Sequence, residues 1–304
     1  MAKKFLSVCL NPTIQNTLLF DRLQVDRVNR ARYYRTDASG KGVNVTRVLS
    51  QRGAAVTHLT HAGGSNKDWF LSLCASDGLD VRYVESESDV RICTTAIDSA
   101  EGTTTELVEE ALPVSESTEE RLLALFDELI RESEALIISG TKAAGYSPSA
   151  IPEMVRRASS LGVLTVLDIK GADLVASLPF KPAVVKPNVH EFFASFPPSA
   201  SVLASATAMR AYAGDYARSW KERYSTELVL TRGSESVWFN EGGIPVEEPV
   251  VPVKALNNIG SGDAFTAGVV YVLAKGGSLR EAVREGARLG ALNAARLKPG
   301  SIAD

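Results

Sequence analysis

Short apolar runs alternate along the chain with longer segments whose apolar residues recur at helical spacing. Several short runs, such as ALIIS at 135–139 and VLTVLD at 163–168, are almost continuously apolar, as is typical of strands buried on both faces. Because strands and helices alternate, the pattern predicts an α/β fold with a mostly parallel sheet and helices on both of its faces. The expected strands are 4–10, 56–62, 135–139, 163–168, 183–186, 227–231 and 236–240.

Helix boundaries are indicated by capping residues. Ser117 and Glu120 have the spacing of a capping box and predict a helix over 117–131. Ser147 and Pro148 predict an N-cap and first helical residue further on. Ser278, with Glu281 three residues later, predicts a second capping box before the long segment that ends near 297.

Two segments interrupt the alternation of strands and helices. Residues 14–37 and 89–110 have the short polar alternation of exposed strands, so they are expected to pair into a small sheet beside the main one. There is no internal repeat and no obvious linker. The sequence therefore predicts a single domain over residues 1–304, with the small sheet formed by these two insertions.

Composition and charge exclude several classes of protein. The chain has 304 residues, of which 45% are hydrophobic and 23% charged, which excludes a wholly disordered, collagenous or coiled-coil protein. A net charge of −3 gives no basic excess for nucleic acid or for an anionic membrane. The longest apolar stretch, 264–274, is too short to span a bilayer, and the apolar start at 5–10 is too short for a signal peptide. We expect a soluble, cytoplasmic protein.

The first glycine-rich site is Gly40-Lys41-Gly42, directly before a helical stretch. Backbone amides beside a lysine at a helix start can bind a phosphate or another oxygen-rich ligand. The site is not a Walker A loop, because Lys41 is followed by glycine where serine or threonine is required. A plain turn carrying a solvated lysine is the alternative interpretation.

The second site is Gly260-Ser261-Gly262-Asp263, at the start of an apolar helix. Glycines here aim amide groups outward at the positive end of the helix, where they can stabilise a developing anion. The same helix end is expected to keep Asp263 ionised at neutral pH, so that it could take the proton of an attacking hydroxyl group. The alternative is an aspartate that only stabilises the helix start.

The third site contains Lys186, Asn188 and Glu191, after a predicted strand. If a helical turn begins here, Asn188 and Glu191 share one face. Their oxygens, with a neighbouring lysine, suit a hydrated Mg²⁺ ion that carries nucleotide phosphates. A capped helix start is the alternative.

The order of these motifs resembles that of the PfkB (ribokinase-like) carbohydrate kinases. Within that family the sequence is most similar to the 1-phosphofructokinase and tagatose-6-phosphate kinase branch. The resemblance covers essentially the whole chain, and each motif is weak when taken alone. The matching segments are LNP at 10–12, VNRA at 28–31, GKGVNV at 40–45, Arg91, TEL at 105–107, SG at 139–140, KPN at 186–188 with Glu191, TRG at 231–233 and GSGD at 260–263.

The resemblance implies a ribokinase-like three-layer α/β/α domain, with the small sheet as a lid, and it implies ATP and Mg²⁺. Asp263 matches the catalytic base, and Gly260, Ser261 and Gly262 match the anion hole. Glu191 and Asn188 match the metal–phosphate motif. The expected substrate-binding residues are Asn11, Gln15, Gly40, Lys41, Asn44, Arg91 and Ser139, and the expected nucleotide-binding residues are Lys186, Asn188, Thr231, Gly233 and Asn293. A homodimer through the lid is a further family expectation.

The sequence departs from the family pattern mainly at the sugar end. Gln15 stands where the family usually has an aspartate that holds sugar hydroxyls, and the usual DTSG is DIKG at 168–171. We expect an ATP-dependent kinase of a phosphorylated ketohexose: fructose 1-phosphate, tagatose 6-phosphate or fructose 6-phosphate. The alternatives are a kinase of an unphosphorylated sugar or nucleoside, and a non-catalytic sugar-phosphate-binding protein.

Overall fold

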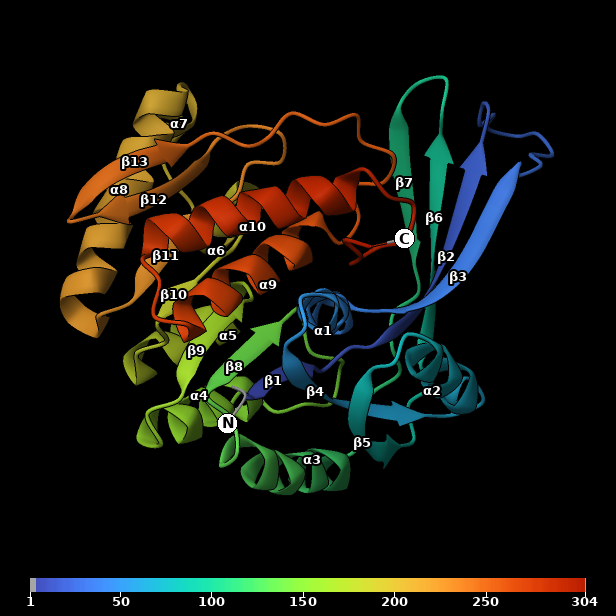
Figure 1. The fold of residues 1–304 in the computed structure, drawn as a ribbon, viewed down its shortest axis with the longest axis horizontal. Helices are drawn as coiled ribbons and strands as arrows, with labels where there is room; N and C mark the ends of the chain where they lie inside the picture. Colours follow the sequence, from blue (N-terminus) through green and yellow to red (C-terminus); the bar gives the residue numbers. More distant parts are fainter. Residues whose placement is uncertain (1–3, 304) are drawn as a thin grey trace.

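The computed structural model describes residues 4–303, which form a large sheet and a small sheet flanked by helices (Figure 1). The large sheet has the strand order β13-β12-β11-β10-β9-β8-β1-β4-β5, and all its pairs are parallel except β11–β12 and β12–β13. Its strands are β1 (Lys4–Cys9), β4 (Ala55–Gly63), β5 (Asp80–Ser86), β8 (Ala135–Ser139), β9 (Leu164–Asp168), β10 (Val184–Val185), β11 (Glu227–Leu230), β12 (Val237–Glu241) and β13 (Ile244–Glu248).

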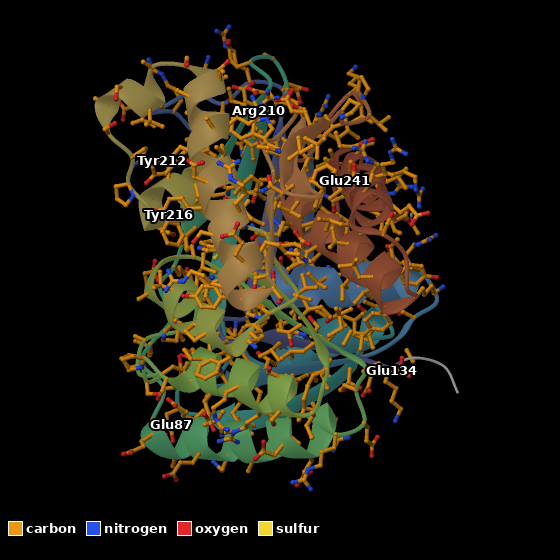
Figure 2. All side chains as sticks on the ribbon, turned by 90° about the vertical axis from the view of Figure 1, so that its left-hand side faces the viewer. Glu87, Glu134, Arg210, Tyr212, Tyr216 and Glu241 are labelled. Carbon is orange, nitrogen blue, oxygen red and sulfur yellow. The ribbon has the colours of Figure 1, made fainter. Side chains whose placement is uncertain are left out.

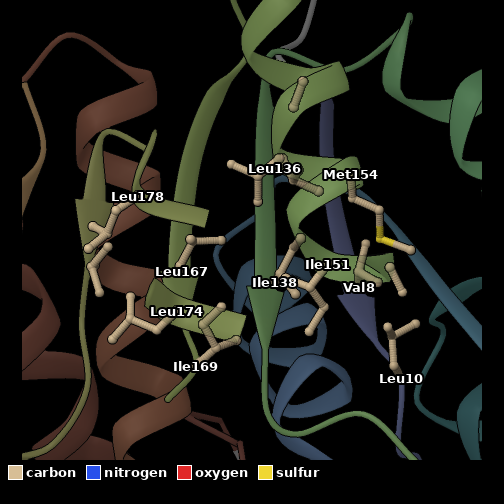
Figure 3. Packing of buried hydrophobic residues seen from close by; sticks show 14 of the residues in the cluster. Val8, Leu10, Leu136, Ile138, Ile151, Met154, Leu167, Ile169, Leu174 and Leu178 are labelled. Atoms are coloured by element: carbon tan, nitrogen blue, oxygen red, sulfur yellow. The ribbon is translucent and has the colours of Figure 1, made fainter. Parts of the chain in front are cut away.

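Helices cover both faces of the large sheet, as the sequence pattern predicts. One face packs against α1 (Lys41–Gln51), α9 (Ser261–Ala274) and α10 (Leu279–Ala294). The other packs against α3 (Glu116–Ile130), α4 (Ala150–Ser160), α5 (Gly171–Ser177), α6 (Val189–Ser195) and α8 (Ala206–Tyr224), and α7 (Ala200–Leu203) precedes α8. Figure 3 shows this second core, in which Val8, Ile138 and Leu167 of three neighbouring strands lie near Ile151 and Met154 of α4. No helix within 4–303 has the length and apolar character needed to cross a membrane.

The aromatic residues of α6 and α8 form a separate group within this layer. Phe192 lies edge-on to Tyr216, with ring centroids 5.5 Å apart, and Phe196 lies 5.3 Å from Trp220. Tyr212 and Tyr216 follow each other along the side of α8 that faces α6 (Figure 2). These contacts fix α6, which begins next to the third motif, against the body of the molecule.

The small sheet stands beside the large one and has the order β3-β2-β6-β7 (Figure 1). Its strands, β2 (Thr13–Phe20), β3 (Tyr33–Ser39), β6 (Arg91–Asp98) and β7 (Thr103–Val108), come from the two segments that interrupt the sequence pattern. The base of this sheet packs on α2 (Lys67–Ser76) through Ile14, Ala38 and Phe70. Because β3 runs directly into α1, the small sheet and the first glycine site are joined by a single residue, Gly40.

All the predicted strands are present. Two further strands are not predicted from the sequence, and two of the predicted helix caps are wrong. The edge strands β5 and β13 were not predicted. Helix α3 is capped by Ser115, whose hydroxyl accepts from the Thr118 amide, so the predicted Ser117–Glu120 capping box is wrong. Ser147 does not cap α4, because its amide and hydroxyl donate to Glu119 of α3 instead. The Ser278–Glu281 capping box of α10 is confirmed.

Candidate active site

The carboxyl ends of the central parallel strands carry most of the predicted site residues. Asn11 follows β1, Ser139 ends β8, Asp168 ends β9 and Lys186 follows β10. Helices α1 and α9 begin at the same edge, which places Lys41 and Asp263 there as well. Ligands bind at this edge in open α/β sheets because loops and helix N-termini converge on it.

Asp168 lies at the centre of this group and is buried. Its Oδ2 atom accepts from the Thr266 hydroxyl at 3.0 Å, and Lys186 Nζ lies 3.3 Å and Ser139 Oγ 3.4 Å from it. Lys41 Nζ is 3.6 Å from the other oxygen. Burial alone would raise the pKa of Asp168, but Lys186 and Lys41 outweigh it and hold the pKa below its ordinary value. Asp168 is therefore a fixed negative charge that keeps two lysines in place.

Lys41 opens α1 and reaches across the site to the third motif. Its Nζ atom lies 3.1 Å from Glu191 Oε1, in addition to its contact with Asp168. Asp168 above all, and then Glu191 and Asp263, raise the pKa of Lys41 well beyond its usual range. Lys41 is therefore a permanent positive charge beside Asp263.

Asp263 is the third residue of α9 and is 5% exposed. Asn44 of α1 donates from Nδ2 to its Oδ2 at 2.8 Å. Burial raises the pKa of Asp263 to about 6, although Lys41 acts in the opposite direction. The carboxyl group is thus mostly ionised at pH 7, as predicted, but its pKa is raised by burial and not lowered by the helix end. A buried carboxyl group with this pKa can act as a general base near neutral pH.

The backbone before Asp263 supplies amide donors. Gly260 has φ +83°, and a Cβ atom there would lie 2.2 Å from the Gly300 nitrogen, so only glycine fits this turn. The Ser261 amide is already bound, donating to the Asn258 carbonyl at 3.2 Å. The amides of Gly262 and Asp263 find no acceptor among the residues the structure describes, so they form the free anion-binding part of the loop.

Asn188 and Glu191 form a capping box at the start of α6. Asn188 Oδ1 accepts from the Glu191 amide at 2.8 Å, and Glu191 Oε2 accepts from the Asn188 amide at 3.0 Å. Because Lys41 occupies the other carboxylate oxygen, both oxygens of Glu191 are engaged. Within 4–303 no group of three or more acidic, histidine or cysteine residues is arranged to hold a metal ion. Any metal here must take most of its ligands from water and phosphate.

Comparison with known protein families identifies the family of the chain. A model of the pfkB family carbohydrate kinases matches residues 8–303. The chain belongs to this family. It is therefore a sugar kinase with a ribokinase-like α/β fold, and both the predicted family and the predicted fold class are confirmed.

Solved structures share the fold of this kinase over nearly its whole length. Phosphofructokinase-2 from Escherichia coli in complex with fructose-6-phosphate is 23% identical with a TM-score of 0.83, and the match covers 99% of this chain and 96% of that chain. The tetrameric inhibited form of the same enzyme is 22% identical with a TM-score of 0.82, covering 97% and 94%. A protein from Thermotoga maritima, described as a possible 1-phosphofructokinase, is 20% identical with a TM-score of 0.83, covering 97% and 93%.

Where the end of β1 meets the start of the small sheet, two buried polar atoms find no protein partner within the described chain: Asn11 Oδ1 and Arg91 Nε. Asn11 is held only by a long hydrogen bond, 3.5 Å, from its Nδ2 to Thr141 Oγ1, and Arg91 donates to the Glu109 carbonyl from its NH1. Unpaired buried polar atoms are costly, so these two fit a polar ligand.

The side chains of Gln15 and Asn44 are hydrogen-bonded to other side chains of the protein. Gln15 is 3% exposed and donates from Nε2 to Thr95 Oγ1 at 2.8 Å, so only its oxygen is available to a sugar hydroxyl. Asn44 is 2% exposed and contacts Asp263. The structure thus places Asn44 beside Asp263, and its expected contact with the substrate stays a prediction.

The predicted nucleotide-binding residues come from the segments after β10 and β11 and from helix α10. Thr231 forms an isolated bridge to Asn188, and Gly233 turns the chain two residues later with φ +65°. Asn293 is fully buried, and its amide nitrogen donates to the Ile259 carbonyl and to Ser261 Oγ. Its side chain therefore supports the loop that carries Gly260 to Asp263, and its expected place in the nucleotide site stays a prediction.

Three important residues of the site were missed from the sequence: Asp168, Thr266 and Arg47. Asp168 had a usable signal, because it is an acidic residue at the carboxyl end of a continuously apolar strand. It was noted only as part of a departure from the family pattern. Thr266 and Arg47 carry no comparable signal. The partner of Thr266 lies 98 positions away, and Arg47 is bound by Asp77 and the Pro299 carbonyl far along the chain as well as by Asn44 one turn before it.

Proposed function

We propose that this kinase transfers the γ-phosphoryl group of ATP to a hydroxyl group of a phosphorylated ketohexose. The substrate would be fructose 1-phosphate, tagatose 6-phosphate or fructose 6-phosphate. The observation that carries the proposal is the position of Asp263, a buried carboxyl group with a pKa of about 6, beside the free amides of Gly262 and Asp263. A proton acceptor next to an anion hole is what in-line phosphoryl transfer to an alcohol requires.

In this mechanism the C-1 or C-6 hydroxyl of the sugar attacks the γ-phosphorus while Asp263 accepts its proton, and the bond between the γ-phosphorus and the bridging oxygen breaks so that ADP leaves. The Gly262 and Asp263 amides, with the positive end of α9, bind the negative charge that develops on the phosphoryl oxygens. Lys41 and Lys186, held by Asp168, add two fixed positive charges to the same region. Bound Mg²⁺ would neutralise phosphate charge, with Glu191 acting on it through a bound water molecule.

The sugar phosphate is proposed to lie between the first glycine site and the start of the small sheet. Arg91 and Lys41 would bind the phosphate already present on the substrate, and Arg91 can do so with two hydrogen bonds. Asn11, Gln15 and Ser139 lie at the same end and would contact the sugar hydroxyls. The unpaired polar atoms of Asn11 and Arg91 support this position.

The small sheet is proposed to serve as a lid and as a dimer interface. A lid would exclude water, which otherwise competes with the sugar as phosphoryl acceptor. Large apolar side chains are exposed on this sheet and its β2–β3 loop: Val25 is 95% exposed, Val28 84%, Tyr34 75% and Leu107 60%. Exposed apolar side chains on both edges of the sheet and on its loop favour association with a second copy of the chain. The use of ATP and a sugar phosphate favours the cytoplasm.

The substrate proposal is tested by a coupled assay of ADP release. The three ketohexose phosphates would be compared with free fructose, ribose and adenosine at equal concentrations. We expect kcat/KM to be highest for one of the sugar phosphates. If a free sugar or adenosine is the best acceptor, the proposal of a phosphorylated substrate is wrong, while the kinase activity stands. Binding of a sugar phosphate without ADP release would instead indicate a non-catalytic binding protein.

The pH dependence of the free enzyme follows from Asp263. Because the base must be deprotonated, kcat/KM should rise about tenfold per pH unit below pH 6 and level off above pH 7, given a pKa of about 6. Measuring kcat/KM between pH 5 and 8.5 in overlapping buffers checks this. An acid limb with a midpoint near pH 4 would mean that a different carboxyl group, or none, limits the reaction.

Glu191→Gln should raise the Mg²⁺ concentration needed for half-maximal activity. The substitution keeps the capping geometry but removes the charge that would orient metal-bound water, for which a loss of about 10–100-fold in metal affinity is typical. Titration of Mg²⁺ at fixed ATP checks this, with Glu281→Gln in the distant α10 capping box as matched control. An unchanged metal requirement in Glu191→Gln would remove Glu191 from the metal site.

A further inference from the structure

Among residues 4–303, Arg47 is the largest side chain that is completely buried, with 1% of its surface exposed. It lies on α1, one turn beyond Asn44. A buried guanidinium group is costly unless its donors are satisfied. Here Nε donates to Asp77 Oδ2 at 2.7 Å, NH1 donates to the Asn44 side-chain oxygen at 3.1 Å and to the Pro299 carbonyl at 3.0 Å, and NH2 donates to the Ala38 carbonyl.

The contact between Arg47 and Asn44 determines which way the Asn44 amide faces. A guanidinium group can only donate hydrogen bonds, so the atom of Asn44 that faces Arg47 must be the oxygen. The Ser39 hydroxyl, 3.2 Å from the same oxygen, can donate to it too. The Asn44 NH2 group is then turned toward Asp263, where it donates at 2.8 Å to the carboxylate. The opposite orientation would set an amide oxygen against the carboxylate.

We propose that Arg47 is a positioning residue for the general base: it holds the Asn44 amide so that Asn44 always donates to Asp263. The inference rests on the proposed role of Asp263 in phosphoryl transfer. Arg47 itself does not touch Asp263 or the substrate. Its effect is to favour the ionised form of a carboxylate that burial would otherwise keep protonated.

Arg47 is itself held by three separate parts of the chain. Asp77 at the end of α2 also pairs with Lys298, and Lys298 Nζ lies 3.8 Å from Asp37 of β3. The Ala38 carbonyl belongs to β3 and the Pro299 carbonyl to the C-terminal segment. Arg47 thus connects the Asn44 side-chain amide, which faces Asp263, to the small sheet and to the C-terminal segment.

Titration of the Asp263 carboxyl group by ¹³C NMR tests the inference in the free protein, with its resonance assigned by its loss in Asp263→Asn. We expect Arg47→Met to raise the pKa of Asp263 by about one to two units, because a charge-assisted hydrogen bond is lost. Arg47→Lys keeps a hydrogen-bond donor toward Asn44, so the pKa of Asp263 in this variant should stay much closer to its wild-type value. The acid limb of kcat/KM should move together with the carboxyl titration.

Two further variants show whether a raised Asp263 pKa comes from the lost orientation of Asn44, from the change in net charge or from impaired folding. Asp77→Asn weakens the anchor of Arg47 but leaves its donors to Asn44, so it should lower stability without raising the pKa of Asp263. Arg47→Met with Asp77→Leu removes both buried charges together, which protects folding if Arg47→Met alone is unstable. This double variant should still show the raised pKa, which net charge could not explain.

The proposal is overturned if the Asp263 pKa is unchanged in the double variant, or if Arg47→Lys and Asp77→Asn raise it as far as Arg47→Met does. The carboxyl titration does not depend on turnover. A wild-type protein without kinase activity would therefore contradict the proposed function, while the titration would still decide the role of Arg47.

Discussion

Asp263→Asn is expected to lower kcat about 10²–10⁴-fold, the usual range for loss of a general base. Asparagine has nearly the same shape as aspartate and can still accept from Asn44, but it cannot take the proton of the attacking hydroxyl. Sugar and ATP should therefore bind with little change in KM. Steady-state kinetics at pH 8, where wild-type Asp263 is ionised, measure the effect cleanly.

A measurement of folding stability shows whether the lower kcat of Asp263→Asn comes from the missing proton acceptor or from a less stable protein. The pKa of Asp263 is higher in the folded protein than in the unfolded chain, so its contribution to stability falls as the pH rises from about 4 through 6. Removing the charge should leave the variant at least as stable as wild type at pH 8. A kcat close to wild type would remove Asp263 from the mechanism.

Arg91→Ala is expected to raise KM for the sugar phosphate about 10- to 150-fold, because a charge-assisted contact contributes about 1.5–3 kcal/mol. The substrate phosphate lies away from the reacting hydroxyl, so the contact is nearly equal in the ground and transition states. KM for ATP should change little, and the preference for sugar phosphate over the same free sugar should narrow. Initial rates with both substrates varied give the two KM values.

A surface arginine provides the matched control. Arg156 on α4 is paired with Glu153 at 2.7 Å and is far from the proposed substrate, so Arg156→Ala should change neither KM. The structure also offers a purely local role for Arg91, which donates to the Glu109 carbonyl at the edge of the small sheet. Unchanged KM values in Arg91→Ala would favour that local role.

The parts of the fold that depend on neighbouring residues could be predicted from the sequence. Continuous apolar runs gave the central strands, and the Ser278–Glu281 cap involves residues three apart. Local signals also compete with one another. Ser115 caps α3 in place of Ser117, and Ser147 is withdrawn from α4 by Glu119, which lies 28 positions earlier.

In the candidate site, too, local features could be predicted from the sequence, whereas contacts between distant residues could not. The glycine turns could be identified because their backbone requirement is local. The orientation of the base could not, because Asn44 and Asp263 are separated by 219 positions and Asp168 and Thr266 by 98. The sequence predicts an ionised Asp263 at neutral pH from the helix end alone, but it does not show the burial that raises the pKa of this carboxyl group to about 6.

The central claim, transfer of phosphate from ATP to a phosphorylated ketohexose, is tested most directly by ³¹P NMR of the reaction mixture. Purified protein would be incubated with Mg²⁺, ATP and each ketohexose phosphate in turn. With the true substrate we expect the γ-phosphate signal to disappear while ADP and a sugar bisphosphate with two phosphomonoester signals form in equal amounts. ATP that stays intact with all three sugar phosphates, or ADP that forms only with inorganic phosphate, would contradict the claim.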